Sequence, residues 1–414
     1  MKSVLLAGAA CLVALPSALR AQAPVGSEFQ VNAYTTGGQG SAAVATDAHG
    51  NFVVVWSDAA GVVGRRFTAS GAPRGGEFLV SSYTAGYPSL PAVASSANGS
   101  FVVVWHSYGP DGSASGVFGH RFDAFGAPAG GEFAVNTYTT GSQSQPAVSS
   151  DASGNFVVVW HSAGQDGNGY GVFGRRFDAS GAALGGEFLV NSYTMGYIGS
   201  QFTPAVDSDA SGNFVVVWVN RYSFFGPVSN RISGQRFDSA GIPQGTEFMV
   251  DMSTGGGKGG PHVARDGAGN FLVVWSISSG FPIPTGRVLG RFFDANATPL
   301  GPEFMVNSFT AASQGGASVD ADLNGNFVVV WQSRGQEGPS FETGVFGQRF
   351  DASGAPVDSE FIVNSYTTGN QSRPAVVSSP DENFLVVWQS DQGGDENVFG
   401  QRFGDRIFRD GFEP

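Results

Sequence analysis

Short runs of apolar residues alternate with polar, glycine-rich segments along the whole chain. The clearest run is FVVVW at residues 156–160, and a near copy of it ends at every tryptophan of the sequence. These residues are Trp56, Trp105, Trp160, Trp218, Trp275, Trp331 and Trp388, at successive intervals of 49, 55, 58, 57, 56 and 57 residues. A period of this length predicts repeated copies of one supersecondary unit.

Each copy predicts four short strands and no helix. In one copy the segments PAVSSD (146–151), FVVVW (156–160), VFGRRF (172–177) and EFLVN (187–191) are separated by stretches rich in Gly, Asp, Ser and Asn. Such stretches favour turns and loops, and the apolar segments are too short and too rich in β-branched and aromatic residues for helices.

The second predicted strand must be buried on both faces, because its apolar residues do not alternate with polar ones. Side chains alternate across a strand, so Phe156, Val158 and Trp160 form a bulky face, and Val157 and Val159 form a slim one. Copies stacked face to face would place bulky side chains against slim ones. The sequence therefore predicts an all-β fold, a seven-bladed β-propeller of four-stranded antiparallel blades.

The two ends of the chain predict how the ring closes. The fourth-strand motif appears early, as EFQVN at residues 28–32, and the last copy ends after the third-strand motif at 398–403. We therefore expect the seventh blade to combine residues 374–403 with the strand 28–32, so that the propeller spans 24–403. This arrangement removes an open sheet edge.

An arginine precedes a glutamate by 11 residues in most copies, which predicts an ion pair across the third and fourth strands. The pairs are Arg66 and Glu77, Arg121 and Glu132, Arg176 and Glu187, Arg236 and Glu247, and Arg349 and Glu360. Arg402 lies too near the C-terminus to have such a partner, and Glu28 remains at the other end. The hypothesis that follows is an ion pair between Arg402 and Glu28 across the closure. These charged pairs and the seven tryptophans are interpreted as structural.

The N-terminal residues 1–23 resemble a secretory signal peptide, with a positive start, an apolar stretch and small residues before the expected cleavage after Ala21 or Ala23. Residues 404–414 form a C-terminal tail. The only cysteine, Cys11, lies in the leader. We expect an exported protein, secreted or at the cell surface, with the periplasm as an alternative, and a monomer.

Net charge argues against two classes of partner. The whole chain carries −13, and removal of Lys2 and Arg20 with the leader gives −13 − 2 = −15. Lys258 is then the only lysine, and no basic run exists. Nucleic-acid binding and attraction to anionic membranes are therefore disfavoured, and no membrane insertion is expected.

The loops that vary between copies are the candidate binding surface, because loops on a rigid scaffold carry function. Four residues that directly follow a tryptophan offer hydrogen-bonding groups suited to a sugar: His106, His161, Gln332 and Gln389. The alternative is that they only end their strands. Tyr222, Phe224 and Phe225 lie in an atypical loop of the fourth copy, where they form a recognition patch or fold back over the axis.

Calcium is a candidate ligand at one turn. Asp320, Asp322 and Asn324 fit the start of a calcium-binding loop. The twelfth position is Trp331 instead of Glu, so the segment is no EF-hand, and a hairpin turn is the alternative. No other cofactor is predicted.

Catalysis has little support in the motifs. None of the five histidines has metal-ligand spacing, and no G-x-S-x-G sequence occurs. The function expected first is therefore a non-catalytic binding or adhesion protein that recognises an extracellular glycan or protein through the variable loops. The alternative is a secreted hydrolase or lyase with one site at the mouth of the central channel, built from loop residues such as Glu337, Glu342, Asp391 and Asp395.

The repeated motifs GNFVVVW, GVFGRRFDASGAP and GGEFxVN, which recur in order over residues 28–403, resemble a repeat of exported bacterial proteins, including RTX-type calcium-binding and adhesin-like chains. The resemblance implies secretion, a β-propeller-like fold, and adhesion or calcium binding. The last residues, IFRDGFEP, resemble a short C-terminal tag of exported bacterial proteins.

Overall fold

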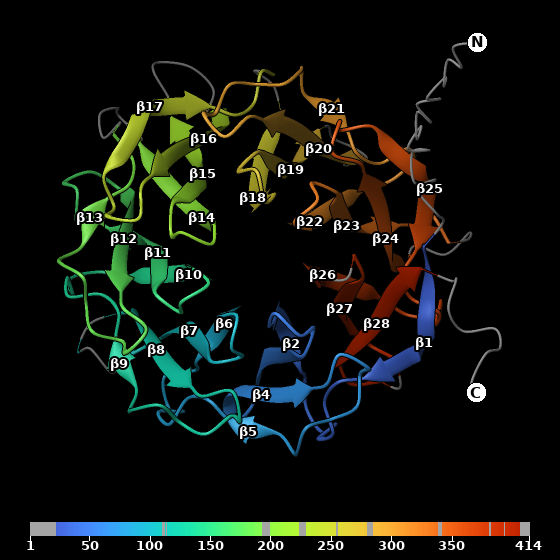
Figure 1. Cartoon of the computed structure of the whole chain (residues 1–414), viewed down its shortest axis with the longest axis horizontal. Coiled ribbons are helices and arrows are strands. Elements are labelled where there is room, and N and C mark those ends of the chain that lie inside the picture. The colour runs from blue at the N-terminus through green and yellow to red at the C-terminus, as the bar shows by residue number, and fades with distance from the viewer. Residues whose placement is uncertain are drawn as a thin grey trace, which may run out of the picture.

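The computed structural model describes residues 22–405 except 110, 111, 113, 193–198, 223–228, 254–255, 280–284, 338–341, 381 and 393. The elements of these described residues are strands, in seven four-stranded antiparallel sheets arranged in a ring (Figure 1). The predicted all-β, seven-bladed propeller is confirmed. None of the described segments is a helix long and apolar enough to span a membrane.

The first strand of each blade lies nearest the axis and the second strand follows outward (Figure 1). The first strands are β2 (Gly40–Thr46), β6 (Ser89–Ser95), β10 (Gln143–Ser150), β14 (Ser200–Ser208), β18 (Gly257–Arg265), β22 (Gln314–Ala321) and β26 (Gln371–Ser378). The second strands are β3 (Phe52–Asp58), β7 (Phe101–Ser107), β11 (Phe156–Ala163), β15 (Phe214–Tyr222), β19 (Phe271–Ser279), β23 (Phe327–Arg334) and β27 (Phe384–Ser390).

The third and fourth strands complete each blade toward the rim. The third strands are β4 (Gly61–Phe67), β8 (Gly116–Phe122), β12 (Tyr170–Phe177), β16 (Ser229–Phe237), β20 (Thr285–Phe293), β24 (Thr343–Phe350) and β28 (Asn397–Asp405). The fourth strands are β5 (Phe78–Leu79), β9 (Phe133–Ala134), β13 (Phe188–Leu189), β17 (Pro243–Met249), β21 (Phe304–Met305), β25 (Pro356–Ile362) and β1 (Gln22–Gln30).

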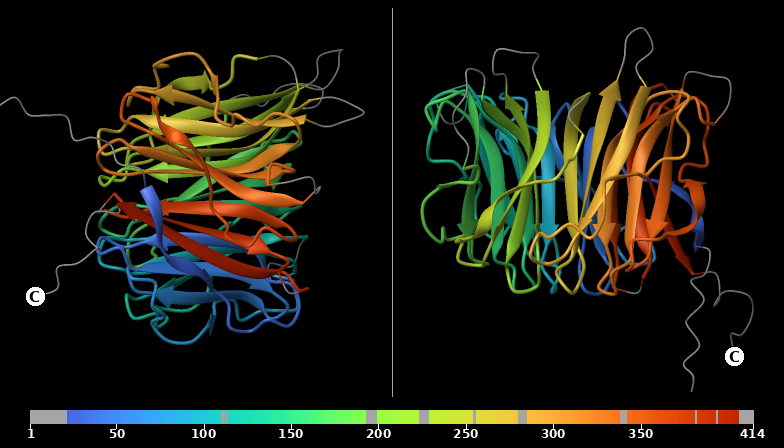
Figure 2. Two further views of the ribbon diagram at one scale, coloured as in Figure 1. Left: turned by 90° about the vertical axis from the view of Figure 1, so that its right-hand side faces the viewer. Right: turned by 90° about the horizontal axis from the view of Figure 1, so that it is seen from above.

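The ring has two different faces, because the strands of every blade are antiparallel. The connections between second and third strands and the crossings between blades lie at one end, here called the long-loop face. The connections between first and second strands and between third and fourth strands lie at the other end, here called the short-turn face (Figure 2).

Bulky and slim faces of neighbouring blades meet as predicted. Phe156, Val158 and Trp160 of the third blade pack with Val102 and Val104 of the second. Corresponding clusters fill the other blade interfaces, and all seven tryptophans are at most 2% exposed. Full burial of an aromatic ring in each interface is a major part of the packing that holds the ring together.

The N-terminal strand closes the ring. β1 pairs antiparallel with β28, from Gln22 opposite Asp405 to Gln30 opposite Phe399. The strand begins six residues earlier than the predicted 28–32, and an irregularity separates Val25 from Phe29. Residues 404 and 405, assigned to the tail, continue β28. Residues 1–21 and 406–414 lie outside the described part of the chain, with most of the predicted leader and tail.

The predicted ion pair between Arg402 and Glu28 does not form. Glu28 Oε2 accepts hydrogen bonds from Ser365 N at 2.7 Å and Ser365 Oγ at 2.8 Å, in the sixth blade. Arg402 Nη1 donates to Ala69 O of the first blade at 2.9 Å. The prediction was wrong because the two side chains leave the seventh blade toward opposite neighbours, so that each one bridges two blades.

The same arrangement repeats around the ring, and the predicted pairs within blades are not among the ion pairs of the described residues. Each fourth-strand glutamate accepts the backbone N–H that follows the fourth strand of the preceding blade. The glutamate and donor residues are Glu77 and Ala33, Glu132 and Ser82, Glu187 and Thr137, Glu247 and Ser192, Glu303 and Met252, Glu360 and Ser308, and Glu28 and Ser365. The glutamates therefore tie each blade to the one before it.

Candidate active site

The axial ends of the first strands on the long-loop face share an unusual backbone geometry. Each first strand has a register shift near its beginning, with one residue in the left-handed region at φ of 50–58°. These residues are Ser41, Leu90, Gln145, Thr203, Gly260, Gly316 and Arg373. Left-handed backbone is uncommon for residues other than glycine. Because all seven blades have it, this bulge belongs to the scaffold, and it re-aims the side chains at the axis.

Two serine–histidine couples lie beside these bulges in the second and third blades. His106 Nε2 is 3.2 Å from Ser89 Oγ, and His161 Nε2 is 2.7 Å from Ser144 Oγ. Burial lowers the pKa of His106, and burial together with the charge of His106 lowers the pKa of His161 to about 4. His161 is therefore neutral at physiological pH and can accept a proton.

A tyrosine ring lies perpendicular to each histidine ring. Tyr108 and Tyr170 lie edge-on, with ring centroids 6.1 Å from His106 and 5.1 Å from His161. Both tyrosines are exposed on the long-loop face. A phenolic hydroxyl is a potential acid, and an exposed ring is a stacking surface for a sugar.

The other two predicted binding residues join a second group, across blades six, seven and one. Gln332 Oε1 accepts the backbone N–H of Arg373 at 3.1 Å, and Arg373 Nη1 donates to Ser41 Oγ at 2.9 Å. Gln389 lies against Gly40 so closely that a Cβ added to this glycine would be only 2.8 Å from Gln389 Oε1. The structure thus divides the four residues into a histidine pair and a glutamine group.

Arg373 was missed by the sequence analysis. Its side chain is exposed, and it places a guanidinium near the central axis on the long-loop face. The signal in the sequence is weak: an arginine precedes the Pro-Ala of the seventh copy, where the other copies have Ser, Leu, Gln, Thr or Gly.

The predicted recognition patch lies mostly outside the described residues. This applies to Phe224 and Phe225. The backbone of Tyr222 ends β15, where it pairs with Ser229, and its side chain is not described.

The oxygens of the predicted calcium loop do not converge. Asp322 Oδ1 accepts the backbone N–H groups of Asn324 and Asn326 at 2.9 Å, whereas Asp320 Oδ2 accepts from Ser378 N of the next blade at 2.5 Å. Asn324 Nδ2 donates to Glu382. In the described part of the chain, no group of three His, Cys, Asp or Glu side chains is placed to hold a metal ion. The geometry matches the alternative of a hairpin turn.

Asp207 and Asp320 form a pair of perturbed carboxyl groups near the short-turn ends of β14 and β22. Burial raises the pKa of Asp207 to about 6. Burial and the charge of Asp207 raise the pKa of Asp320 to about 7. Both groups would exchange protons near neutral pH, as acid and base catalysts do. The signal in the sequence is an acid at this strand position in only two copies, and at Asp320 it was interpreted as part of a calcium-binding loop.

The acidic loop residues of the predicted hydrolase are engaged in local contacts. Asp391 accepts both the backbone and the side-chain N–H of Asn370, and Asp395 accepts from Gly37 N. Glu337 Oε1 accepts from Asn364 Nδ2 at 2.9 Å, and burial raises the pKa of Glu337 with a smaller contribution from Glu342. Glu337 therefore contacts the crossing between the sixth and seventh blades through Asn364.

A buried ion cluster joins the fourth and fifth blades below the long-loop face. Asp251 Oδ2 is 2.8 Å from both Arg231 Nε and Lys258 Nζ, and the side chains of Asp251 and Lys258 are fully buried. The sequence contained a signal for this cluster: the single lysine outside the leader stands where several other copies have glutamine.

Comparisons with known proteins agree on the fold. No protein-family model and no curated protein matches the chain. A protein of unknown function from Dyadobacter fermentans has a TM-score of 0.55 at 10% identity and covers 93% of this chain and 99% of its own. An ulvan lyase of polysaccharide lyase family PL25, bound to -[GlcA(1-4)Rha3S]-, has a TM-score of 0.56 at 9% identity and covers 90% and 95%.

A third neighbour, the α-L-arabinofuranosidase of Fusarium graminearum with an iminosugar inhibitor, has a TM-score of 0.50 at 12% identity and covers 75% of this chain and 91% of its own. At these identities the likeness shows the fold. The neighbours that have a stated activity are a lyase and a hydrolase. These neighbours count against the first expectation, a non-catalytic binding or adhesion protein, which is corrected here, and they favour its alternative, a hydrolase or lyase.

Proposed function

We propose that the chain is an exported, monomeric enzyme that cleaves an acidic polysaccharide by β-elimination at the axial opening of the long-loop face. The observation that carries the proposal is the pair of neutral serine–histidine couples at Ser89–His106 and Ser144–His161, in a fold shared with a lyase of a glucuronate-containing polysaccharide. The exposed Arg373 adds a cation at the same end of the axis.

Elimination needs the groups that this end of the axis offers. A base removes the proton on the carbon next to the uronate carboxylate, the bond from C4 to the glycosidic oxygen breaks, and a C4–C5 double bond forms. The leaving oxygen then takes a proton. His161, with Ser144 as a relay, is the assigned base, and Tyr170 is the assigned acid. Arg373, in the seventh blade, is assigned to binding another acidic unit of the same polymer.

Hydrolysis is the second candidate, favoured by the raised pKa values of Asp207 and Asp320. Glycoside hydrolases use two carboxyl groups, one of them protonated near neutral pH. These residues lie toward the short-turn face, so this mechanism would place the substrate at the opposite end of the axis.

The test is incubation of the purified chain with a polysaccharide of GlcA(1-4)Rha3S repeats and, separately, with arabinan. Elimination is followed by the ultraviolet absorbance of the new double bond, and hydrolysis by reducing ends without that absorbance. His161→Gln should abolish elimination, and His49→Gln, on the short-turn face, should leave it unchanged. Because the pKa of His161 is about 4, activity should stay level from neutral pH to about pH 5 and fall near pH 4.

Loss of activity in Asp320→Asn, with His161→Gln active, would support hydrolysis and contradict elimination. Inactivity on both polysaccharides and on other uronate polymers would contradict the proposed function.

A further inference from the structure

A pocket opens on the short-turn face between the turns of the fourth and fifth blades. Its volume is about 430 Å³. The corresponding clefts between blades three and four, seven and one, and one and two have volumes of about 220, 60 and 20 Å³. Small-molecule sites usually measure roughly 300–1,000 Å³, so among these clefts only the one between blades four and five has the size of a ligand site.

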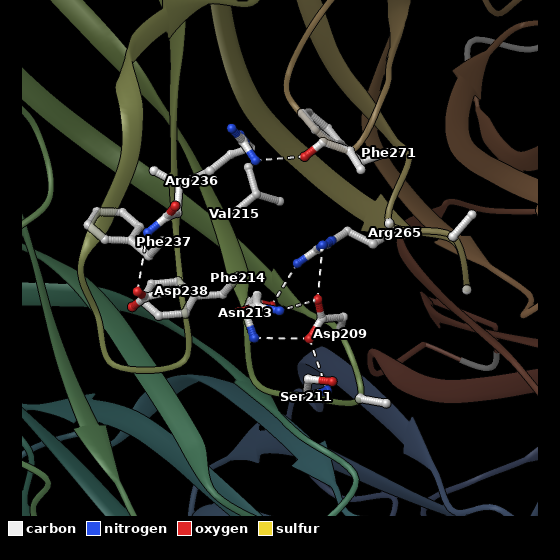
Figure 3. A pocket seen from close by; sticks show the side chains of 16 residues that line it. Asp209, Ser211, Asn213, Phe214, Val215, Arg236, Phe237, Asp238, Arg265 and Phe271 are labelled. Carbon is white, nitrogen blue, oxygen red and sulfur yellow. Dashed lines mark hydrogen bonds and ion pairs between the residues drawn. The ribbon is translucent and has the colours of Figure 1, made fainter.

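Two guanidinium groups reach into this pocket, Arg236 from β16 and Arg265 from the end of β18 (Figure 3). Arg236 Nη1 donates to Ala295 O at 2.7 Å, and no described carboxylate lies within ion-pair distance of Arg236. Arg265 Nη1 donates to Asn213 O at 2.7 Å and Nη2 is 3.2 Å from Asp209 Oδ2, whereas its buried Nε has no hydrogen-bond partner.

The two arginines repel each other. Burial lowers the pKa of Arg236, and the charge of Arg265 lowers it further. Like charges held in a partly enclosed site cost free energy that a bound anion would recover. A carboxylate suits the site well because guanidinium groups bind it through two parallel hydrogen bonds.

The remaining walls suit hydroxyl groups. Asp238 Oδ2 accepts from Gln244 Nε2 at 3.2 Å, and Asp209 Oδ2 accepts from Asn213 Nδ2 at 2.9 Å. The Oδ1 atoms of both aspartates accept backbone N–H groups of their own turns, which fixes the carboxylates. Phe214, Phe237 and Phe271 line the interior. Fixed polar groups that both donate and accept, with aromatic rings beneath them, match a sugar.

The second guanidinium is specific to the fifth blade, so the repeated scaffold does not require it, although it also bridges to the turn of the fourth blade. Arg236 has counterparts in most blades, where an arginine reaches the next blade's turn, as Arg66 and Arg176 do. The residues that stand at the position of Arg265 in the other blades are Thr46, Ser95, Ser150, Ser208, Ala321 and Ser378.

We propose that this pocket binds an acidic sugar unit, a uronate, with its carboxylate between Arg236 and Arg265 and its hydroxyl groups on Asp209, Asp238 and Gln244. The site is distinct from the long-loop face, and it extends the proposed function, because a uronate is the unit on which the proposed elimination acts. A site of this kind on the opposite face would hold a second segment of the polymer or a released product.

The test is calorimetric titration of the full chain with sodium glucuronate, glucose and sodium sulfate. We expect glucuronate to bind most tightly. Arg265→Ser, the residue of four other blades, should weaken binding about 10-fold or more, as expected for a lost charge-assisted hydrogen bond. Arg236→Gln should act in the same direction, while the matched Arg176→Gln in the third blade should leave binding unchanged.

Unchanged glucuronate affinity in Arg265→Ser, or an equal loss in Arg176→Gln, would overturn the assignment. Sulfate binding as tight as glucuronate would also overturn it, because a simple anion site would then account for the arginines. The two proposals can be told apart. His161→Gln should remove catalysis without changing glucuronate binding. If the chain binds glucuronate but has no lyase activity, only the proposed elimination is contradicted.

Discussion

Asp251 and Lys258 occupy positions where other blades carry an uncharged amide pair. Asn136 Nδ2 donates to Gln143 Oε1 at 3.3 Å, and Asn191 Nδ2 donates to Gln201 Oε1 at 3.2 Å. Asp251 also accepts the N–H of Ile232 through Oδ1, as those asparagines do for their own third strands. The ion pair is therefore a charged version of a scaffold contact, with Arg231 added.

The first prediction is a double-mutant cycle at this pair. Asp251→Asn should cost about 3–5 kcal/mol of unfolding free energy, because it leaves buried Lys258 without its counter-charge. Adding Lys258→Gln should recover most of that loss by restoring the amide pair, while the partly exposed Arg231 can turn to solvent. Denaturant unfolding measures both free energies. A double variant no more stable than Asp251→Asn would contradict the interpretation that the ion pair replaces the amide pair of the other blades.

The second prediction concerns Asp320 and pH. Its folded pKa of about 7 lies above the unfolded value of 3.8, so the native state binds more protons between these pH values. Its contribution to stability is therefore full below about pH 4 and is lost as pH rises through 7. Asp320→Asn mimics the protonated form and should be more stable than the parent at pH 8, by on the order of 2 kcal/mol after allowance for partial exposure.

This advantage should shrink to nothing near pH 4. The matched control is Ala45→Ser, at the same position of the first blade, whose effect should not vary with pH because it changes no ionisable group and lies in a blade that adjoins neither Asp207 nor Asp320. Parallel shifts of both variants across the pH range, measured by thermal unfolding, would argue against a raised pKa at Asp320.

At the scale of elements, the repeated charges act between blades. Each glutamate of the fourth strand accepts an N–H from the preceding blade, and arginines of the third strand reach a carbonyl of the following blade, as Arg66 does at Ala124 O. Hydrogen bonds to charged groups contribute about 1.5–3 kcal/mol each when well formed. The hydrogen bonds of Glu28 and Arg402 to the neighbouring blades are exposed to solvent, so each is expected to contribute less than this range, about 1 kcal/mol.

The third prediction separates this arrangement from the ion pair expected from the sequence. Glu28→Ala and Arg402→Ala should each destabilise the protein by about 1 kcal/mol, because each loses a bond to a different neighbour. Their effects should add within about 0.5 kcal/mol, as for independent sites. A coupling energy well above about 0.5 kcal/mol, measured by equilibrium unfolding, would instead support the ion pair between Glu28 and Arg402.

The strands were predictable because their signals are local. The run FVVVW at residues 156–160 fixes a doubly buried strand by its lack of alternation, and the spacing of the copies fixes the number of blades. The partners of Glu28 and Arg402 were not predictable, because an 11-residue spacing says nothing about which face of the blade each side chain leaves. The pocket at Arg265 depends on two turns from different blades, a contact that no local pattern encodes.

At the scale of the whole molecule, the ring is closed by the seventh blade, which is made from both ends of the chain. Phe29 of β1 contacts Phe52 and Phe67 of the first blade, with ring centroids at 6.4 and 5.7 Å. Phe188 of the third blade contacts Phe214 and Phe237 in the same way, at 6.2 and 5.5 Å. Each ring covers a glycine. A Cβ added to Gly400 would lie 2.8 Å from the ring of Phe29, and one added to Gly174 would lie 2.6 Å from the ring of Phe188.

The last prediction uses this equivalence to test the closure. If β1 is docked as firmly as a fourth strand that follows its own blade, Phe29→Ala and Phe188→Ala should cost the same, about 3 kcal/mol, because each removes one ring from an equivalent interface. The two strands differ in connectivity and in length: β13 has two residues and follows β12 through a short turn, whereas β1 has nine residues and comes from the other end of the chain. A much smaller cost for Phe29→Ala in urea unfolding would mean that the N-terminal strand leaves the ring easily, and that the last blade tolerates an open edge.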